Sequence, residues 1–155
     1  MDENLELLEY IYKNAEMGTF SLTKLIELLN GKENKIKKTV EDEIKGYEKY
    51  LKESKKLIEK SKYELKHNSM MAKMGASMGI KKETLSDNSD ASIAHMIIEG
   101  LTMGVVDISS KINNYKKSAD KKIISLAEEF LKFQEEEIEK LKSFFIINSS
   151  FFNII

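Results

Sequence analysis

The sequence contains no cysteine, no proline and no arginine. The absence of cysteine excludes disulfide bonds, iron–sulfur clusters, thiolate zinc sites and cysteine nucleophiles. Proline interrupts the hydrogen bonding of a helix interior, so a chain of 155 residues without any proline favours an all-α fold. Because every cation is lysine, the chain also lacks the side chain best suited to bidentate binding of phosphate or carboxylate.

The residues that are present indicate a soluble globular domain. Hydrophobic residues make up 41% and charged residues 33% of the chain, and its length suits one domain with a hydrophobic core. The formal net charge of −1 gives no general attraction to nucleic acid or to an anionic membrane, and we expect no nucleic-acid partner and no membrane span. The N-terminal sequence MDENLELLEY is acidic where a signal peptide would be basic, so we expect a cytoplasmic location.

The spacing of apolar residues predicts four long helices. In residues 3–29 apolar side chains recur every three or four positions, as in a helix that buries one face, and Asn30-Gly31 indicates where it ends. We expect the other three helices at 33–67, 90–115 and 118–145. The first connection is short, so the first two helices should lie antiparallel. The sequence therefore predicts an all-α, antiparallel four-helix bundle over residues 1–145, with one long crossover between helices two and three.

The third predicted helix contains the most apolar stretch of the chain, residues 93–112 (IAHMIIEGLTMGVVDISSKI). A helix that is apolar on most sides is expected to be buried by neighbours on several sides, so we place it at the centre of the bundle. Its Glu, His and Asp residues make it too polar for an obvious membrane span. Gly100 and Gly104 predict close packing of another backbone. His95 and Glu99 are four residues apart; they could ligate a metal ion, but we favour a hydrogen-bonded pair at a surface or interface.

Residues 67–92 differ from the rest, because Gly, Ser, Asn and Asp accumulate and the amphipathic periodicity is lost. We expect one or two short apolar turns across the bundle, formed by the methionines Met70, Met71, Met74 and Met78. Thioethers near His67 suit Cu(I), but methionine more often serves as adaptable packing, which is the interpretation we favour. Ser89 is a candidate N-cap for the helix that follows.

The last ten residues, 146–155 (IINSSFFNII), are unusually apolar for a chain terminus. They are too short to span a membrane. We favour a tail that docks on the bundle or takes part in an oligomer contact; fraying and association with a membrane surface are the alternatives. A homo-oligomer could therefore form through the tail or through the helix predicted at 90–115.

Projection of the helices onto their inward faces identifies five polar residues, which are the candidate site: Glu16, Glu43, Tyr47, Gln134 and Glu137. A buried carboxylate is costly unless it is paired or bound to something. Carboxylates that converge in a bundle core are the usual ligands of di-iron and di-manganese centres. Two other interpretations stay open. One is a buried hydrogen-bond network that fixes helix register, with Glu137 protonated or bonded to Tyr47; the other is a single all-oxygen metal site of Glu16, Glu43 and Glu137.

The segments LEYIYKNAEMG (residues 8–18) and LAEEFLKFQEEEIEKLKSF (residues 126–144) resemble helices one and four of ferritin-like, rubrerythrin-like proteins. The short, long, short order of connections over residues 3–145 is also that of the ferritin-like bundle, whose one long crossover joins its second and third helices. The resemblance implies a ferritin-like topology. It also implies metal ligands from all four helices: one Glu each from helices one and three, and Glu-x-x-His from helices two and four.

Matched residue by residue, this ligand set is degraded. Glu16 matches the first-helix Glu, whereas helix two has Gly46 where the resemblance implies His. In helix four, Gln134 stands in place of the Glu and Glu137 in place of the His. The only Glu of helix three, Glu99, projects away from the inward face. These departures argue against a dinuclear oxidising iron site.

We therefore expect a ferritin-like protein that is non-catalytic and has no cofactor, with a buried polar cluster in place of the di-iron site. One alternative is an iron- or manganese-binding protein or oxidoreductase with a carboxylate-only site. Another is a helical module that binds a partner protein. No phosphate-binding glycine loop and no Ser–His–Asp set supports other chemistry.

Overall fold

A computed structural model describes residues 2–145, and all of its regular structure is helical. Over these residues there is no strand, which confirms the all-α fold class. The elements in chain order are α1 (Glu3–Leu28), α2 (Lys37–Lys60), α3 (Met70–Ser86), α4 (Asp90–Tyr115), α5 (Lys121–Lys142) and the 3₁₀ turn η1 (Ser143–Phe145). The apolar tail, 146–155, lies outside the described residues, as do the contacts predicted for it.

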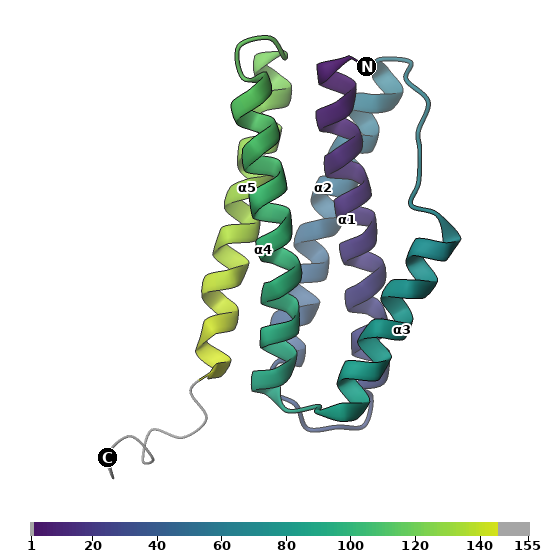
Figure 1. Cartoon of the computed structure of the whole chain (residues 1–155), viewed down its shortest axis with the longest axis vertical. Helices are drawn as coiled ribbons and strands as arrows, with labels where there is room; N and C mark the ends of the chain where they lie inside the picture. The colour runs from purple at the N-terminus through teal and green to yellow at the C-terminus, as the bar shows by residue number, and fades with distance from the viewer. Residues whose placement is uncertain (1, 146–155) are drawn as a thin grey trace.

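The long helices are arranged as two antiparallel pairs (Figure 1). Helices α1 and α2 run side by side in opposite directions, and α4 and α5 form the second pair. The chain crosses from the first pair to the second through residues 61–89, which contain α3. This helix lies along the lower half of α1 in Figure 1 and leads directly into α4.

Helix α1 agrees with the sequence prediction and α2 is shorter than predicted at both ends. The turn after α1 uses Gly31 with a φ of +79°, a conformation that glycine adopts without strain. The segment before α2 stays non-helical because the Lys35 N–H donates to Asp90 Oδ2 and Asn34 Nδ2 donates to Asp90 Oδ1 at the start of α4. At the other end, Lys62 adopts a φ of 63° and the Tyr63 N–H donates to the carbonyl of Ile58, a Schellman-type ending.

The prediction for residues 67–92 was wrong, because the segment forms a helix of 17 residues. Ser69 caps its N-terminus by accepting a hydrogen bond from the Ala72 N–H at 3.0 Å. The methionines do not pack across the bundle but lie on the exposed side of α3, with Met71 84% exposed. This helix could not be predicted from periodicity because it has no apolar stripe. Thr84 is the only buried residue that it contributes among the described residues.

Helix α4 has the predicted bounds, with Ser89 as its N-cap, but it is not central. It packs against α5 and α1 on one side only, and Met103 and Val106 on its other side are 69% and 61% exposed. Within residues 2–145 it is the one helix long and apolar enough to cross a membrane by length and composition. The core helix of a soluble protein passes the same test, so this is weak evidence for a span.

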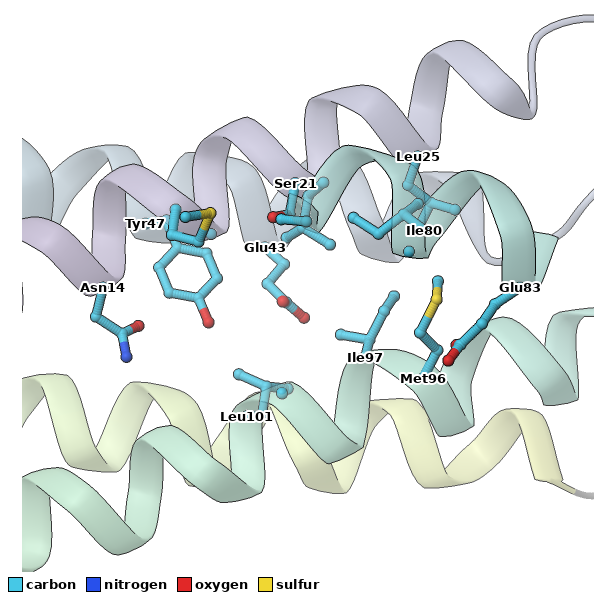
Figure 2. Close-up of a pocket in the computed structure, with 16 residues that line it drawn as sticks. Asn14, Ser21, Leu25, Glu43, Tyr47, Ile80, Glu83, Met96, Ile97 and Leu101 are labelled. Atoms are coloured by element: carbon cyan, nitrogen blue, oxygen red, sulfur yellow. The ribbon is translucent and has the colours of Figure 1, made fainter. Parts of the chain in front are cut away.

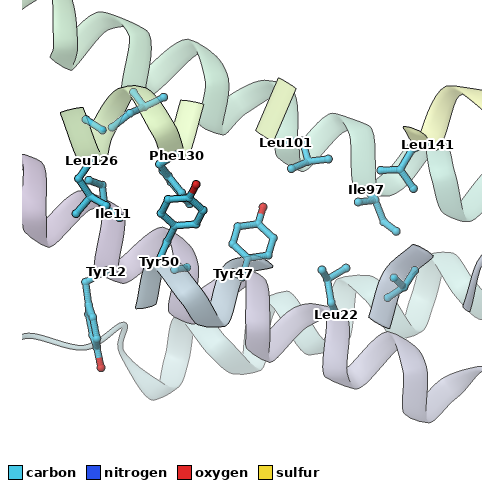
Figure 3. Packing of buried hydrophobic residues seen from close by; sticks show 14 of the residues in the cluster. Ile11, Tyr12, Leu22, Tyr47, Tyr50, Ile97, Leu101, Leu126, Phe130 and Leu141 are labelled. Carbon is cyan, nitrogen blue, oxygen red and sulfur yellow. The ribbon is translucent and has the colours of Figure 1, made fainter. Parts of the chain in front are cut away.

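The core lies between the two pairs of helices and is largely aliphatic, with an aromatic group at its middle (Figure 3). Tyr47 and Tyr50 of α2 contact Phe130 and Phe133 of α5, with ring centroids 5.1 to 6.2 Å apart. Tyr12 points the opposite way, toward the crossover. The aromatic group joins the first pair of helices to the second and holds α2 beside α5.

Candidate functional site

Four of the five predicted site residues are buried together in the core. Glu43 and Tyr47 come from α2, and Gln134 and Glu137 come from α5; each is at most 5% exposed. Their burial confirms the inward projection of these helices. Glu16 of α1 is separate from them, and its contacts are described below.

Gln134 begins a series of hydrogen-bonded side chains that crosses the core. Its Nε2 donates to Asn14 Oδ1 at 3.3 Å. Asn14 Nδ2 in turn donates to the hydroxyl of Tyr10 at 3.3 Å. The Tyr10 hydroxyl lies 3.5 Å from both the Gly104 carbonyl oxygen and Asp107 Oδ2. These bonds join α5, α1 and α4 at one level, and Tyr47 of α2 lies beside Gln134.

Burial makes Tyr47 and Tyr10 weak acids. It raises the pKa of Tyr47 far above its ordinary value, and the nearby Glu43 carboxyl raises it further. It raises the pKa of Tyr10 to about 12, against the opposing effect of its hydrogen bond with Asn14. Both hydroxyls therefore stay protonated near neutral pH and act as hydrogen-bonding groups.

The two buried glutamates differ in their partners. Glu137 Oε1 accepts a hydrogen bond from Lys140 Nζ at 3.0 Å, and this ion pair raises the pKa of Lys140. Glu43 is 1% exposed, and its Oε1 has no hydrogen-bond partner within residues 2–145. Burial, with a smaller contribution from the Glu137 charge, raises the pKa of Glu43 to about 8. Glu43 is thus a largely neutral carboxyl group at pH 7, not the ion that sequence inspection would assume.

Glu16 of α1 is hydrogen-bonded to the crossover. Its Oε1 accepts from the backbone N–H of Asn68 at 2.7 Å, and its Oε2 lies 2.7 Å from His67 Nδ1. Lys73 approaches to 3.7 Å. Burial favours the neutral form of Glu16, but the hydrogen bonds from Asn68 and His67 outweigh it and hold its pKa below the ordinary value. The structure does not bring Glu16 to Glu43 and Glu137.

Three glycines allow the buried side chains to approach neighbouring helices. A Cβ at Gly46 would lie 2.1 Å from Phe133 Cε1, and a Cβ at Gly18 would lie 2.8 Å from the Tyr47 ring. A Cβ at Gly104 would lie 2.5 Å from Gln134 Nε2. Gly104 therefore confirms the predicted close packing, although it meets a side chain and not a backbone.

Gly100 differs from Gly104, and the prediction of close packing was wrong for it. A Cβ at Gly100 would meet no atom of the described residues within 4 Å. The helix α4 turns Gly100 toward a cavity, whereas Gly104, one turn later, lies against α5 and α1.

This cavity of about 390 Å³ lies between α1, α3 and α4, with α2 at its inner end (Figure 2). Its walls are mainly apolar, including Met17, Leu25, Ile80, Met96, Ile97 and Leu101. Glu43 and Tyr47 form its inner end, and Figure 2 shows the Glu43 carboxyl pointing into the space between α1 and α4. Concave, apolar pockets with a few polar groups are typical of small-molecule sites, whose volumes run from about 300 to 1,000 Å³.

The candidate metal ligands do not form a ligand set of the ferritin-like kind. Over residues 2–145 no three His, Cys, Asp or Glu side chains come close enough together to hold one metal ion. His95 Nε2 lies 2.9 Å from Glu99 Oε1 on the exposed side of α4, which confirms the surface pair. His67 is engaged with Glu16, and its Nδ1 lies 3.2 Å from the Tyr12 hydroxyl.

Sequence inspection missed Asn14, Tyr10 and the cavity. Tyr10 and Asn14 are four residues apart on α1, a spacing that places them on one face, and this could have indicated a polar strip beside the apolar one. The cavity depends on where α3 lies, and the sequence predicted no helix there.

Comparison of the chain with models of protein families, with curated proteins and with solved structures finds no match. Its function therefore has to be inferred from the geometry and chemistry of its own side chains.

Proposed function

We propose that this chain is a non-catalytic helical-bundle protein with the ferritin-like order of connections. In this proposal α1, α2, α4 and α5 are the four bundle helices and residues 61–89 are the long crossover, into which α3 is inserted. The direction of each helix in Figure 1 supports it, because α1 is antiparallel to both α2 and α4, as the ferritin-like order requires.

The observation that carries the non-catalytic proposal is the packing of Phe133 against Gly46. The resemblance places a histidine ligand at position 46, and the ring of Phe133 fills the space that a side chain there would need. The residues present do not fit a two-metal centre, because Gln134 supplies a neutral amide in place of a carboxylate and its Nε2 donates to Asn14.

The polar cluster has a structural role in this proposal. The hydrogen bonds from Gln134 through Asn14 and Tyr10 to Gly104 and Asp107 join α5, α1 and α4, so sliding one of these helices by one turn would leave buried polar groups without partners. Such a group costs about 1–3 kcal/mol when it is left unpaired in a core. The cluster therefore sets the register of the helices.

Metal analysis of the full chain, together with the variant Gln134→Leu, tests this proposal. We expect purified protein to contain iron and manganese far below one equivalent, before and after incubation with each metal. Gln134→Leu should lower the free energy of unfolding by about 1–3 kcal/mol, because it removes the hydrogen-bond donor to Asn14 Oδ1. One equivalent of tightly held metal, lost in Glu43→Gln, would refute the proposal.

A carboxylate-only metal site is a second candidate, supported by two unpartnered oxygens, Glu43 Oε1 and Glu137 Oε2. Hard cations such as Mn²⁺ and Fe²⁺ take oxygen ligands, and two carboxylates with water could hold one ion. The same experiment separates the two functions. A single bound metal that both Glu43→Gln and Glu137→Gln abolish would favour this candidate.

A partner-binding or self-associating module is a third candidate, and it is supported by exposed apolar side chains. Met70, Met71 and Met78 on α3 and Met103 on α4 are each more than two-thirds exposed. Methionine is common at adaptable binding surfaces. Sedimentation of the full chain tests self-association: a dimer that Met103→Lys converts to a folded monomer would place an interface on α4.

A further inference from the structure

The proposed function leaves Glu43 unexplained. Gln134 Nε2 and Asn14 are hydrogen-bonded to each other, and Glu137 Oε1 accepts from Lys140. Gln134 Oε1 and Glu137 Oε2 also lack partners in the described part of the chain, but neither residue lines the cavity. Glu43 Oε1 is buried without any partner among residues 2–145, although the carboxyl lines a cavity large enough for a small molecule. A buried polar group without a partner is costly, and in native proteins it commonly marks a functional site or an unseen ligand.

The charged groups of the cavity walls indicate the sign of the charge on such a ligand. The described residues that line it include two carboxyl groups, Glu43 at the inner end and Glu83 on α3, and neither lysine nor histidine. The other polar groups, Asn14, Ser21 and Tyr47, are neutral. An anion would therefore meet no compensating charge in the cavity, whereas a cation would meet two carboxyl groups.

The apolar side chains of the wall indicate that the rest of the ligand is apolar. Side chains of α1, α3 and α4 supply thioether and aliphatic surface between the two carboxyl groups. Burial of apolar area drives binding to such a surface, and a single polar group at its end fixes the orientation.

We propose that the cavity binds a small molecule with an apolar body and one protonated amine, and that this ammonium group donates a hydrogen bond to the carboxylate of Glu43. The apolar body lies between α1 and α4, against Leu25, Ile97 and Leu101. An ammonium–carboxylate hydrogen bond at a buried carboxyl group is stronger than a bond between neutral groups. The ligand supplies the partner that Glu43 lacks.

Two glycines keep room for this ligand. Gly79 on α3 and Gly100 on α4 both line the cavity, and a Cβ at either position would meet no atom of the described residues within 4 Å. A larger side chain at Gly100 can therefore be accommodated by the fold, and it would occupy space that the ligand needs.

A matched series of three probes tests the charge requirement on the full-length chain. The probes are n-hexylammonium, 1-hexanol and hexanoate, which share one apolar chain and differ in the charge of the head group. Titration followed by isothermal calorimetry and by NMR shifts of the cavity residues measures each affinity. We expect n-hexylammonium to bind at least about tenfold more tightly than either of the other two.

The variants Glu43→Gln and Glu48→Gln provide the matched comparison. Both remove one carboxylate from α2, but Glu48 is exposed and lies outside the cavity. Glu43→Gln should weaken n-hexylammonium about tenfold or more and leave 1-hexanol nearly unchanged, whereas Glu48→Gln should leave both unchanged. Gly100→Leu should abolish binding of both probes while helical circular dichroism is retained.

The pH dependence gives a further readout. The titratable groups facing Glu43 are Tyr47 on its own helix, Glu137 and Lys140 on α5, and Glu83 across the cavity; the lining residues of α1 and α4 carry none. Because the pKa of Glu43 is about 8, binding of the cation displaces its proton below that pH. The affinity should then rise by nearly tenfold per pH unit up to about pH 8, with proton release.

Three results would overturn the proposal. One is that no probe binds, and another is that 1-hexanol or hexanoate binds as tightly as n-hexylammonium. The third is that Glu43→Gln and Glu48→Gln bind n-hexylammonium equally. None of these results depends on metal content, so failure of this proposal can be distinguished from failure of the proposed function.

Discussion

The buried carboxyl of Glu43 should make the stability of the protein fall as the pH rises from about 4.5 to 8. In the folded chain Glu43 holds its proton until about pH 8, because burial disfavours the charged form. In the unfolded chain it loses the proton near its ordinary value of 4.5. Between these values the folded state binds more protons than the unfolded state, so the free energy of unfolding decreases with pH.

The magnitude follows from the difference between the two pKa values. Each pH unit between them changes the free energy of unfolding by about 1.4 kcal/mol per group. At pH 7 the accumulated loss is about 3 kcal/mol relative to pH 4.5, and it approaches its limit above pH 8. Losses of this size are large beside the 5–15 kcal/mol total stability that is usual for a domain.

The variant Glu43→Gln removes this dependence. Glutamine has nearly the shape of a protonated glutamate and cannot ionise. The free energy of unfolding of the variant should therefore not show the decrease with pH that ionisation of Glu43 causes in the native chain. The stability of the variant relative to the native chain should therefore increase with pH, by about 3 kcal/mol between about pH 4.5 and 7. If the amide hydrogens of the glutamine change the free energy of unfolding, they change it by the same amount at every pH and leave this slope unchanged.

Urea denaturation followed by circular dichroism, repeated at intervals from about pH 4.5 to 8.5, measures the slope. Glu48→Gln serves as the control, because this exposed residue of α2 should follow the native curve. If native chain and Glu43→Gln run parallel over the whole range, Glu43 ionises normally in the folded state and the argument from its burial is refuted.

Further substitutions test the packing. Gly46→Ala should lower the free energy of unfolding by about 1–3 kcal/mol in chemical denaturation, because its Cβ would overlap Phe133. Gly75→Ala, where a Cβ meets nothing within 4 Å, should instead raise it by about 1 kcal/mol, and a loss there would contradict the placement of α3. Phe130→Ala should cost about 3–5 kcal/mol, since the ring is fully buried. Glu16→Gln should speed hydrogen exchange in residues 61–69 and leave α2 unchanged, because the Asn68 N–H loses a charged acceptor.

The positions of four helices and the buried polar residues could be predicted because each helix except α3 has a regular apolar face, although α2 and α5 are shorter than predicted at both ends. The bounds of α4 were predicted correctly, and Gln134 and Glu137 lie on the buried face of α5 as expected. Helix periodicity reports which side of a helix is buried, and that information is local.

The position of α4 and the partners of Glu16 could not be predicted in this way. An apolar helix is expected to be central, yet the face with Met103 and Val106 is exposed, because no other described helix covers it. The pairing of Glu16 with His67 and Asn68 depends on how the crossover returns along α1. The exposure of α4 and the pairing of Glu16 both depend on tertiary arrangement, which local periodicity does not report.

Three costs of this fold lie at one cavity. A buried, unpartnered carboxyl at Glu43 disfavours the folded state at neutral pH, and the exposed Gly79 and Gly100, which also line the cavity, each cost about 1 kcal/mol relative to alanine inside a helix. The two glycines lie where a side chain would fit, so close packing with a neighbouring helix does not explain them. A core selected only for stability would fill the space and replace the carboxyl. Local losses of stability that share one concave site are typical of binding sites, and this is why the cavity beside Glu43, more than the polar network behind it, is where a function should be sought first.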